Sequence, residues 1–146
     1  MHVGEVMTRS CSIIDSNDSL QKAAQVMREE NIGILPVAEN DKLVGIITDR
    51  DIVTRGLAQG KGANARVREA MTANVKYCFE DEDLDHTLEN MAEIQLRRLP
   101  VMNRSKRLVG IVTLADAARY YSPDAVGTAF CGVVGPGEII GQASLD

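Results

Sequence analysis

The segment Lys42–Asp51 reads KLVGIITDRD, and the segment Arg107–Asp116 reads RLVGIVTLAD. Each is an apolar run that contains one glycine and ends in a threonine, with an aspartate three residues after the threonine. A short apolar run of this kind predicts a buried strand, and Thr-x-x-Asp predicts the turn at which a helix begins. The chain therefore has two strand-to-helix corners of the same design.

The Thr-x-x-Asp corner has two interpretations. A threonine at the N-cap accepts a hydrogen bond from an N–H of the first helical turn, and an aspartate in that turn complements the helix dipole, so the pattern needs no ligand. Alternatively, a hydroxyl, free N–H groups and a carboxylate at one edge of a sheet can bind a sugar or a phosphate. Two such corners at matching positions favour a pair of sites.

The similarity extends well beyond these two segments. Val3–Thr8 (VGEVMT) and Val67–Thr72 (VREAMT) lie 64 residues apart, and so do the two Leu-Pro-Val runs that begin at Leu35 and Leu99. One residue is then inserted in the second copy before the Gly-containing strands. This pattern indicates an internal duplication of a small domain, because the period is too long for an ordinary solenoid repeat.

Each copy is predicted to be a β-α-β-β-α unit, so the fold class is α/β (α+β). In the first copy Asp18 and Gln21 have the spacing of a capping box, and Asn31 and Gly33 suit the end of the helix that follows. The strands are expected at 12–14, 34–38 and 42–47, with helices over about 20–31 and 49–58. The second copy repeats this order with strands at 77–79, 99–102 and 107–112, a helix that carries Leu84, Leu88 and Met91, and a helix at 114–120.

The chain divides at a glycine-containing polar segment, residues 59–64. We assign residues 1–60 to repeat 1, residues 61–121 to repeat 2 and residues 122–146 to a tail that is rich in glycine and proline. We expect this tail to be a flexible or partner-docked extension.

The composition limits the classes of function. The 146 residues are 45% hydrophobic and 25% charged, as in an ordinary soluble domain, and the formal net charge is −5. A chain of this charge has no basic field to attract nucleic acid. No apolar stretch approaches 18 residues and no secretory leader is recognisable, so we expect a cytoplasmic protein that does not enter the membrane.

No residue pattern points to metal binding or to catalysis. The cysteines Cys11, Cys78 and Cys131 are far apart in sequence, which is typical of small apolar side chains in a reducing compartment, and only Cys131 is expected to be exposed. His2 and His86 have no partners at ligand spacing. Because nucleophile groupings and paired carboxylates are also missing, we expect neither a metal site nor an enzyme.

The four motifs that occur twice in the same order resemble a tandem pair of CBS domains, known as a Bateman module. They are Val-x-x-x-Met-Thr, Leu-Pro-Val, the apolar run around glycine, and Thr-x-x-Asp. The run Thr48–Val53 (TDRDIV) further resembles small stand-alone bacterial members of the family. The resemblance implies repeats related by a pseudo-twofold axis, and homodimers in which four repeats form a flat disc. It also implies an adenosine-containing ligand, such as AMP, ADP, ATP, NAD(H) or S-adenosylmethionine, in the clefts between repeats.

The resemblance places the family's threonine and ribose-binding aspartate at Thr48 and Asp51, and again at Thr113 and Asp116. A carboxylate can accept hydrogen bonds from both ribose hydroxyls, and charge-assisted bonds are about twice as strong as neutral ones. Adenine needs an apolar slot with main-chain groups along its edge. The strand residues that could form this slot are Ile13, Ile14, Ile34 and Leu35, while Pro36 and Pro100 would keep its edge free of a competing N–H.

The two copies differ where a phosphate would need cations. Before Leu-Pro-Val the first copy has Gly33-Ile34 and the second has Arg97-Arg98, which could bind a phosphate with bidentate hydrogen bonds. Alternatively, these arginines pair with surface acids such as Glu93 or Asp83, where an ion pair contributes little. Arg50 is a further candidate, although an arginine at a helix start is often only solvated.

Two hypotheses of function follow from the sequence. In the first, a dimer senses an adenosyl ligand and signals to a protein partner through its bound state. In the second, the chain is a homodimeric interaction or assembly protein whose clefts stay empty and whose aspartates only cap helices.

Overall fold

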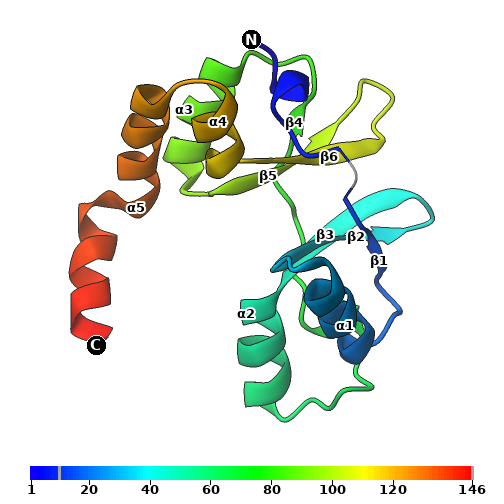
Figure 1. Cartoon of the computed structure of the whole chain (residues 1–146). Coiled ribbons are helices and arrows are strands. Elements are labelled where there is room, and N and C mark those ends of the chain that lie inside the picture. The colour runs from blue at the N-terminus through cyan, green and yellow to red at the C-terminus, as the bar shows by residue number, and fades with distance from the viewer. Residues whose placement is uncertain (10, 146) are drawn as a thin grey trace. The chain divides into compact units, whose positions relative to one another are not determined.

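The computed structural model describes residues 1–9 and 11–145, which form two compact units (Figure 1). The repeat-1 unit contains Cys11–Lys76, and the repeat-2 unit contains Tyr77–Asp146 together with Met1–Ser10. The lead-in segments, residues 3–8 at the start of repeat 1 and residues 67–72 near the start of repeat 2, are therefore each part of the unit built on the other repeat. Each unit has its own sheet and its own hydrophobic core.

Each unit contains one three-stranded sheet. In the repeat-1 unit β1 (Ile14–Asp15) runs parallel to β2 (Ile34–Glu39), which is antiparallel to β3 (Lys42–Thr48). Asn40 and Asp41 join β2 to β3 with positive φ angles of 49° and 65°, as a tight two-residue hairpin turn requires.

The sheet of the repeat-2 unit has the same topology. Here β4 (Cys78–Phe79) is parallel to β5 (Arg98–Met102), and β5 is antiparallel to β6 (Leu108–Thr113). The predicted α/β fold class and the β-α-β-β-α order of both copies are confirmed.

The first helix of each repeat packs an apolar face on the sheet. These helices are α1 (Leu20–Glu30) and α3 (Leu84–Ile94), and each ends at a residue with left-handed φ, Asn31 at 54° and Gln95 at 57°. The predicted capping box at Asp18 was wrong by one residue. Ser19 is the N-cap and its hydroxyl accepts from the N–H of Lys22 at 3.0 Å, because the Asp18 carboxylate instead accepts from the N–H of Asp15.

The second helix of each repeat begins at a Thr-x-x-Asp corner. In the repeat-1 unit α2 (Asp49–Asp51) continues as a π-helical turn, η2 (Ile52–Gly56), and a 3-10 turn, η3 (Leu57–Gln59). In the repeat-2 unit the corresponding helix is α4 (Leu114–Tyr120). Both segments agree with the helices expected from the sequence.

The two lead-in segments lie along the outer strands of the sheets. Each contains a 3-10 turn, η1 (Val3–Glu5) or η4 (Val67–Glu69), followed by a threonine that exchanges backbone hydrogen bonds with the strand. Thr8 pairs with Ile111 of β6, and Thr72 pairs with Ile46 of β3.

This close approach explains the glycine in each repeated strand. A Cβ atom at Gly45 would lie 2.8 Å from the carbonyl oxygen of Thr72, and one at Gly110 would clash with the carbonyl oxygen of Thr8. Since real Cβ atoms do not approach so closely, only glycine leaves room for the lead-in segment.

The tail differs from expectation. Pro123–Leu145 forms the helix α5, which packs against α3 and α4 (Figure 1). Ala129 and Val133 are 4% and 3% exposed and belong to the core of the repeat-2 unit. The expectation of a flexible or partner-docked extension was therefore wrong for residues 123–133, because small residues here allow a close contact between helices. Gly132 lies against Ala92 of α3.

Within the residues that the structure describes, no helix has both the length and the apolar character needed to cross a bilayer.

Candidate functional site

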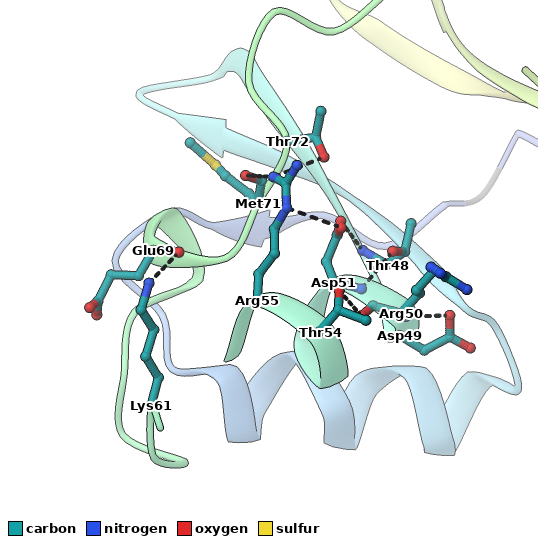
Figure 2. Close-up of polar contacts among 10 residues, drawn as sticks. All are labelled: Thr48, Asp49, Arg50, Asp51, Thr54, Arg55, Lys61, Glu69, Met71 and Thr72. Carbon is teal, nitrogen blue, oxygen red and sulfur yellow. Dashed lines mark hydrogen bonds and ion pairs between the residues drawn. The ribbon is translucent and has the colours of Figure 1, made fainter. Parts of the chain in front are cut away.

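The first Thr-Asp corner, Thr48 and Asp51, is a reciprocal capping box between β3 and α2 (Figure 2). The N–H of Asp51 donates to Oγ1 of Thr48 at 3.0 Å, and the N–H of Thr48 donates to Oδ2 of Asp51 at 3.1 Å. The carboxylate is thereby held in one orientation at the edge of the sheet.

The second Thr-Asp corner, Thr113 and Asp116, has the same geometry between β6 and α4. The N–H of Asp116 donates to Oγ1 of Thr113 at 3.0 Å, and the N–H of Thr113 donates to Oδ2 of Asp116 at 3.1 Å. Asp116 is only 6% exposed. The helix-cap interpretation of both aspartates is confirmed, and in each corner the cap uses only one carboxylate oxygen.

The other carboxylate oxygen has different surroundings in the two corners. In the first, Oδ1 of Asp51 lies 4.0 Å from Nε of Arg55, whose Nη1 donates to the carbonyl oxygen of Met71 at 3.1 Å and to Oγ1 of Thr72 at 3.4 Å (Figure 2). Among the described residues, Asp116 forms no ion pair. The position equivalent to Arg55 is occupied by Tyr120, which is 58% exposed.

The structure places Arg98 beside the second corner. Arg98 begins β5 directly opposite Thr113 in the antiparallel register, and it is exposed. Arg97 precedes it, its carbonyl oxygen accepts from the N–H of Leu114 at 3.1 Å, and its guanidinium lies 5.5 Å from the centre of the Phe130 ring of α5. Neither arginine pairs with an acid in the described part of the chain, Glu93 and Asp83 included. Arg98 therefore keeps its donors available beside Thr113.

In the first corner, a carboxylate lies beside Gly33, the residue equivalent to Arg97. The N–H of Asp49 donates to the carbonyl oxygen of Gly33 at 3.0 Å, and a Cβ atom at Gly33 would lie only 2.9 Å from Oδ2 of Asp49. The exposed Asp49 carboxylate thus covers the site at which the Arg97 side chain begins in the other repeat. Arg50 is also exposed, and its N–H donates to Oδ1 of Asp49 at 2.8 Å (Figure 2).

The apolar candidates separate into buried and accessible side chains. Ile14, Leu35 and Pro36 are almost fully buried in the core of the repeat-1 unit, so they could offer a ligand main-chain atoms only. Ile34 is half-buried and lies opposite Thr48 in the sheet, and Ile13 is 51% exposed. These two side chains are the ones that an adenine ring could contact.

Sequence reasoning missed the contacts of Arg55 and Asp49. The i,i+4 spacing of Asp51 and Arg55 is a recognisable signal for a side-chain pair on a helix. The contact between Asp49 and Gly33 joins residues 16 positions apart and has no comparable signal in a single sequence.

The titratable groups with shifted pKa values lie elsewhere. Burial raises the pKa of the Cys78 thiol to about 12 and also raises that of Cys11. A hydrogen bond from Arg104 lowers the pKa of Asp81, and a hydrogen bond to Asp85 raises that of Tyr121. Cys131 is exposed, as expected. Among the side chains that the structure describes, in residues 1–9 and 11–134, no group of three His, Cys, Asp or Glu could hold a metal ion.

Comparison with known proteins identifies relatives of the whole repeat pair. Hypoxic response protein 1 of Mycobacterium tuberculosis is 40% identical over 124 residues, which cover 84% of this chain and 86% of that protein. Its crystal structure, with two coordinated zinc ions, matches 84% of this chain and 100% of that one with a TM-score of 0.75.

Two solved relatives contain adenosyl compounds. The CBS domain pair of protein MJ0100, in complex with 5′-methylthioadenosine and S-adenosyl-L-methionine, is 36% identical and matches 84% of this chain and 100% of that one with a TM-score of 0.74. CBSX2 in complex with AMP is 25% identical and matches 81% of this chain and 93% of that one with a TM-score of 0.72.

The family assignment covers both repeats. Residues 3–57 and 67–123 each match the family described as CBS domain. These segments contain both Thr-Asp corners and both lead-in segments. The chain therefore belongs to the CBS-domain family and carries two CBS domains in tandem.

Proposed function

We propose that this protein is a regulatory module that binds an adenosine-containing ligand at its Thr-Asp corners and transmits the bound state to a protein partner. The observation that carries this proposal is the geometry of the two aspartates. Each carboxylate is fixed by a capping box through Oδ2, which leaves Oδ1 for a hydrogen bond from a ligand, although Oδ1 of Asp51 also lies 4.0 Å from Nε of Arg55. The adenosyl complexes of MJ0100 and CBSX2 support the choice of ligand class.

The chemistry of a ribose suits this arrangement. Its two neighbouring hydroxyls are donors, and a carboxylate that cannot rotate binds them with little loss of side-chain entropy. An adenine ring attached to that ribose could contact an accessible apolar side chain such as Ile34, which lies opposite Thr48. Main-chain groups of the β-strands would then be available to the edge of the ring.

The second corner is the better candidate for a phosphorylated ligand. Arg98 lies opposite Thr113 in the sheet and is exposed, so its guanidinium could reach a phosphate attached to a ribose at Asp116. An arginine can hold a phosphate through two parallel hydrogen bonds. Arg97 could join it only by leaving the ring of Phe130.

We further propose that the chain acts as a homodimer. Val53 and Leu57, on the helical stretch that follows the first corner, are 55% and 72% exposed, and apolar side chains of this kind suit a contact with a second chain. A ligand can change how such a dimer meets its partner only if it binds one of two states more tightly. Assembly without any ligand is the alternative, and it predicts that nucleotides have no effect.

Thermal unfolding in the presence of ligands tests the proposal. The purified chain would be heated with AMP, ADP, ATP, NAD, NADH or S-adenosylmethionine, and with GMP as a control for the base. At 100 times the dissociation constant, a ligand that binds the folded state stabilises it by about 2.7 kcal/mol, which raises Tm by on the order of 5–10 °C. At least one adenosyl compound should give such a shift while GMP gives none.

A matched variant tests the site assignment. In a chain with Asp51→Asn and Asp116→Asn, each amide can still cap its helix, so the Tm without ligand should change little. The ligand-induced shift should disappear because the charge that holds the ribose is gone. A flat panel for the wild-type chain would leave assembly as the function, and a full shift in the double variant would show that the ligand binds elsewhere.

A further inference from the structure

The two Thr-Asp corners differ in charge next to the same capping-box geometry: the first has equal numbers of acids and arginines, and the second has an excess of arginines. We propose that the first corner selects an adenosyl ligand without phosphate groups and the second a phosphorylated one, with Asp49 as the residue that excludes phosphate from the first. This inference rests on the proposed function, because it assumes that the aspartates bind ribose. It adds the class of ligand at each corner and a specificity-determining residue.

Asp49 places a carboxylate at the position equivalent to Arg97, directly before the position equivalent to Arg98. Gly33 has no side chain, and the space beside its Cα atom is occupied by the Asp49 carboxylate, since a Cβ atom there would lie 2.9 Å from Oδ2. The neighbouring strand residue, Ile34, is apolar. A phosphate beside this strand end would meet the Asp49 carboxylate, and neither position would offer it a guanidinium. Like charges at short range repel each other.

The cations of the first corner balance its two carboxylates and leave no excess positive charge for a phosphate. Arg55 is held by the carbonyl oxygen of Met71 and by Thr72, and it lies beside Asp51. Arg50 extends from the exposed side of α2, away from the Arg55 contacts (Figure 2). With two aspartates and two arginines, the corner carries no net formal charge.

The second corner has the reverse pattern. Leu114 replaces Asp49 and is buried, so no acid follows Thr113. Arg97 and Arg98 replace Gly33 and Ile34, and Arg119 is added on α4. One aspartate, Asp116, and three arginines give a net formal charge of +2, which favours an anionic ligand.

Binding measurements on single-corner variants test the proposal. Asp116→Asn leaves only the first carboxylate, and Asp51→Asn leaves only the second. Each full-length variant would be titrated by calorimetry with adenosine and with AMP, which share base and ribose and differ by one phosphate. The Asp116→Asn chain should bind adenosine roughly tenfold more tightly than AMP, and the Asp51→Asn chain should show the opposite preference of similar size.

The role of Asp49 requires a further substitution and a matched control. Asp49→Asn in the Asp116→Asn chain should raise the affinity for AMP roughly tenfold and leave that for adenosine unchanged. Asp41→Asn removes the same charge from the β2–β3 turn, where asparagine tolerates the positive φ of 65°, and it should leave both affinities unchanged. Raising the salt concentration should reduce the effect of Asp49→Asn, because ions screen it.

The outcomes separate this inference from the function on which it rests. If the wild-type chain binds neither compound, both fail. If the Asp51→Asn chain binds AMP while the first corner binds nothing, or if both corners prefer the same compound, the inference fails and the proposed function stands. An unchanged ratio of AMP to adenosine affinity after Asp49→Asn would show that Asp49 does not exclude phosphate.

Discussion

Asp51 and Asp116 complete the capping boxes of their helices, and the ligand-binding role proposed for them depends on the same bonds. In each, Oδ2 accepts the N–H of the capping threonine, and this bond fixes the direction of Oδ1. A substitution by alanine would therefore remove the half of the capping box that the aspartate side chain supplies, as well as the charge. Asparagine is the more informative replacement because it retains an oxygen for the cap and removes only the charge.

Cys78 gives the clearest pH dependence at the level of a single residue. Burial raises the pKa of its thiol to about 12 from an ordinary value near 9.0. Between these two values the unfolded chain has released this proton and the folded chain has kept it, so the thiol favours unfolding increasingly as pH rises. The loss of unfolding free energy from this group should approach about 1.4 kcal/mol per pH unit above pH 9 and be absent below it.

Urea unfolding of the wild-type chain and of Cys78→Ala from pH 7.5 to 10.5 measures this effect. Other groups titrate equally in both proteins, so the difference between the two free energies isolates Cys78. As pH rises above 9, the free energy of unfolding of the wild-type chain should fall relative to that of the variant. A difference that stays constant over the whole range would contradict the prediction.

Sequence patterns predicted the residues of the corners but not all of their neighbours. Thr48, Asp51, Thr113 and Asp116 follow from local spacing, because a capping box is made by residues three apart. The contact of Asp49 with Gly33 could not be predicted in this way, since it depends on how β2 begins beside the end of β3. Burial of Leu35 likewise depends on which face of a short strand meets the core.

At the scale of elements, the helix α5 forms although its glycine content predicts no helix. Glycine is unfavourable in a helix by about 1 kcal/mol relative to alanine, so a glycine-rich tail is predicted to be an extension without a helix. The strands, the helices α1, α3 and α4, and the helical stretch 49–59 follow from hydrophobic periodicity, which the tail lacks. Its helix depends on packing against α3, and that contact is visible only in the folded unit.

The contact between α5 and α3 predicts opposite effects for two glycines. Gly132→Ala should destabilise the protein by about 1–3 kcal/mol, because the new Cβ atom would lie 2.6 Å from Cβ of Ala92. Gly127 has nothing within 4 Å of its Cβ position, so Gly127→Ala should stabilise the protein by about 0.5–1 kcal/mol. Urea unfolding of both variants measures the difference.

The double variant Gly132→Ala with Ala92→Gly provides the control for this contact. Removing the methyl group of Ala92 should restore part of the stability lost at Gly132, which would appear as a favourable coupling energy between the two positions. If both glycine substitutions stabilise the protein equally, α5 does not pack on α3 at Gly132.

At the scale of the whole molecule, the lead-in segments connect parts of the chain that are distant in sequence. Val3, Val6 and Met7 belong to the core of the repeat-2 unit, and Val67 and Ala70 belong to that of the repeat-1 unit. Two complete small domains in chain order are the simplest interpretation of a sequence duplication. Which sheet a lead-in segment joins is decided by long-range pairing, which repeats alone do not reveal.

Deleting residues 1–9 should therefore weaken the repeat-2 unit selectively. The N–H of Ile111 loses its acceptor, the carbonyl oxygen of Thr8 at 3.0 Å, while the N–H of Ile46 keeps the carbonyl oxygen of Thr72 at 2.9 Å. Loss of the buried side chains Val3 and Val6 adds roughly 3 kcal/mol or more of destabilisation. Hydrogen exchange measured by mass spectrometry should show faster exchange in β6 and unchanged exchange in β3. Equal acceleration in both strands would contradict this assignment of the segments.

The pairing of Thr8 with Ile111 also has a consequence for the order of events during synthesis. Ribosomes add about 5–20 residues per second, so the roughly 100 residues that separate these partners delay their pairing by about 5–20 s. The repeat-1 unit needs nothing beyond Lys76 and can be completed during this time. Meanwhile the apolar side chains near the N-terminus have no core to enter and are open to chaperones. The lead-in segment that contains Thr8 thus leaves the ribosome long before its partner strand and reaches its native position only after that strand has been made.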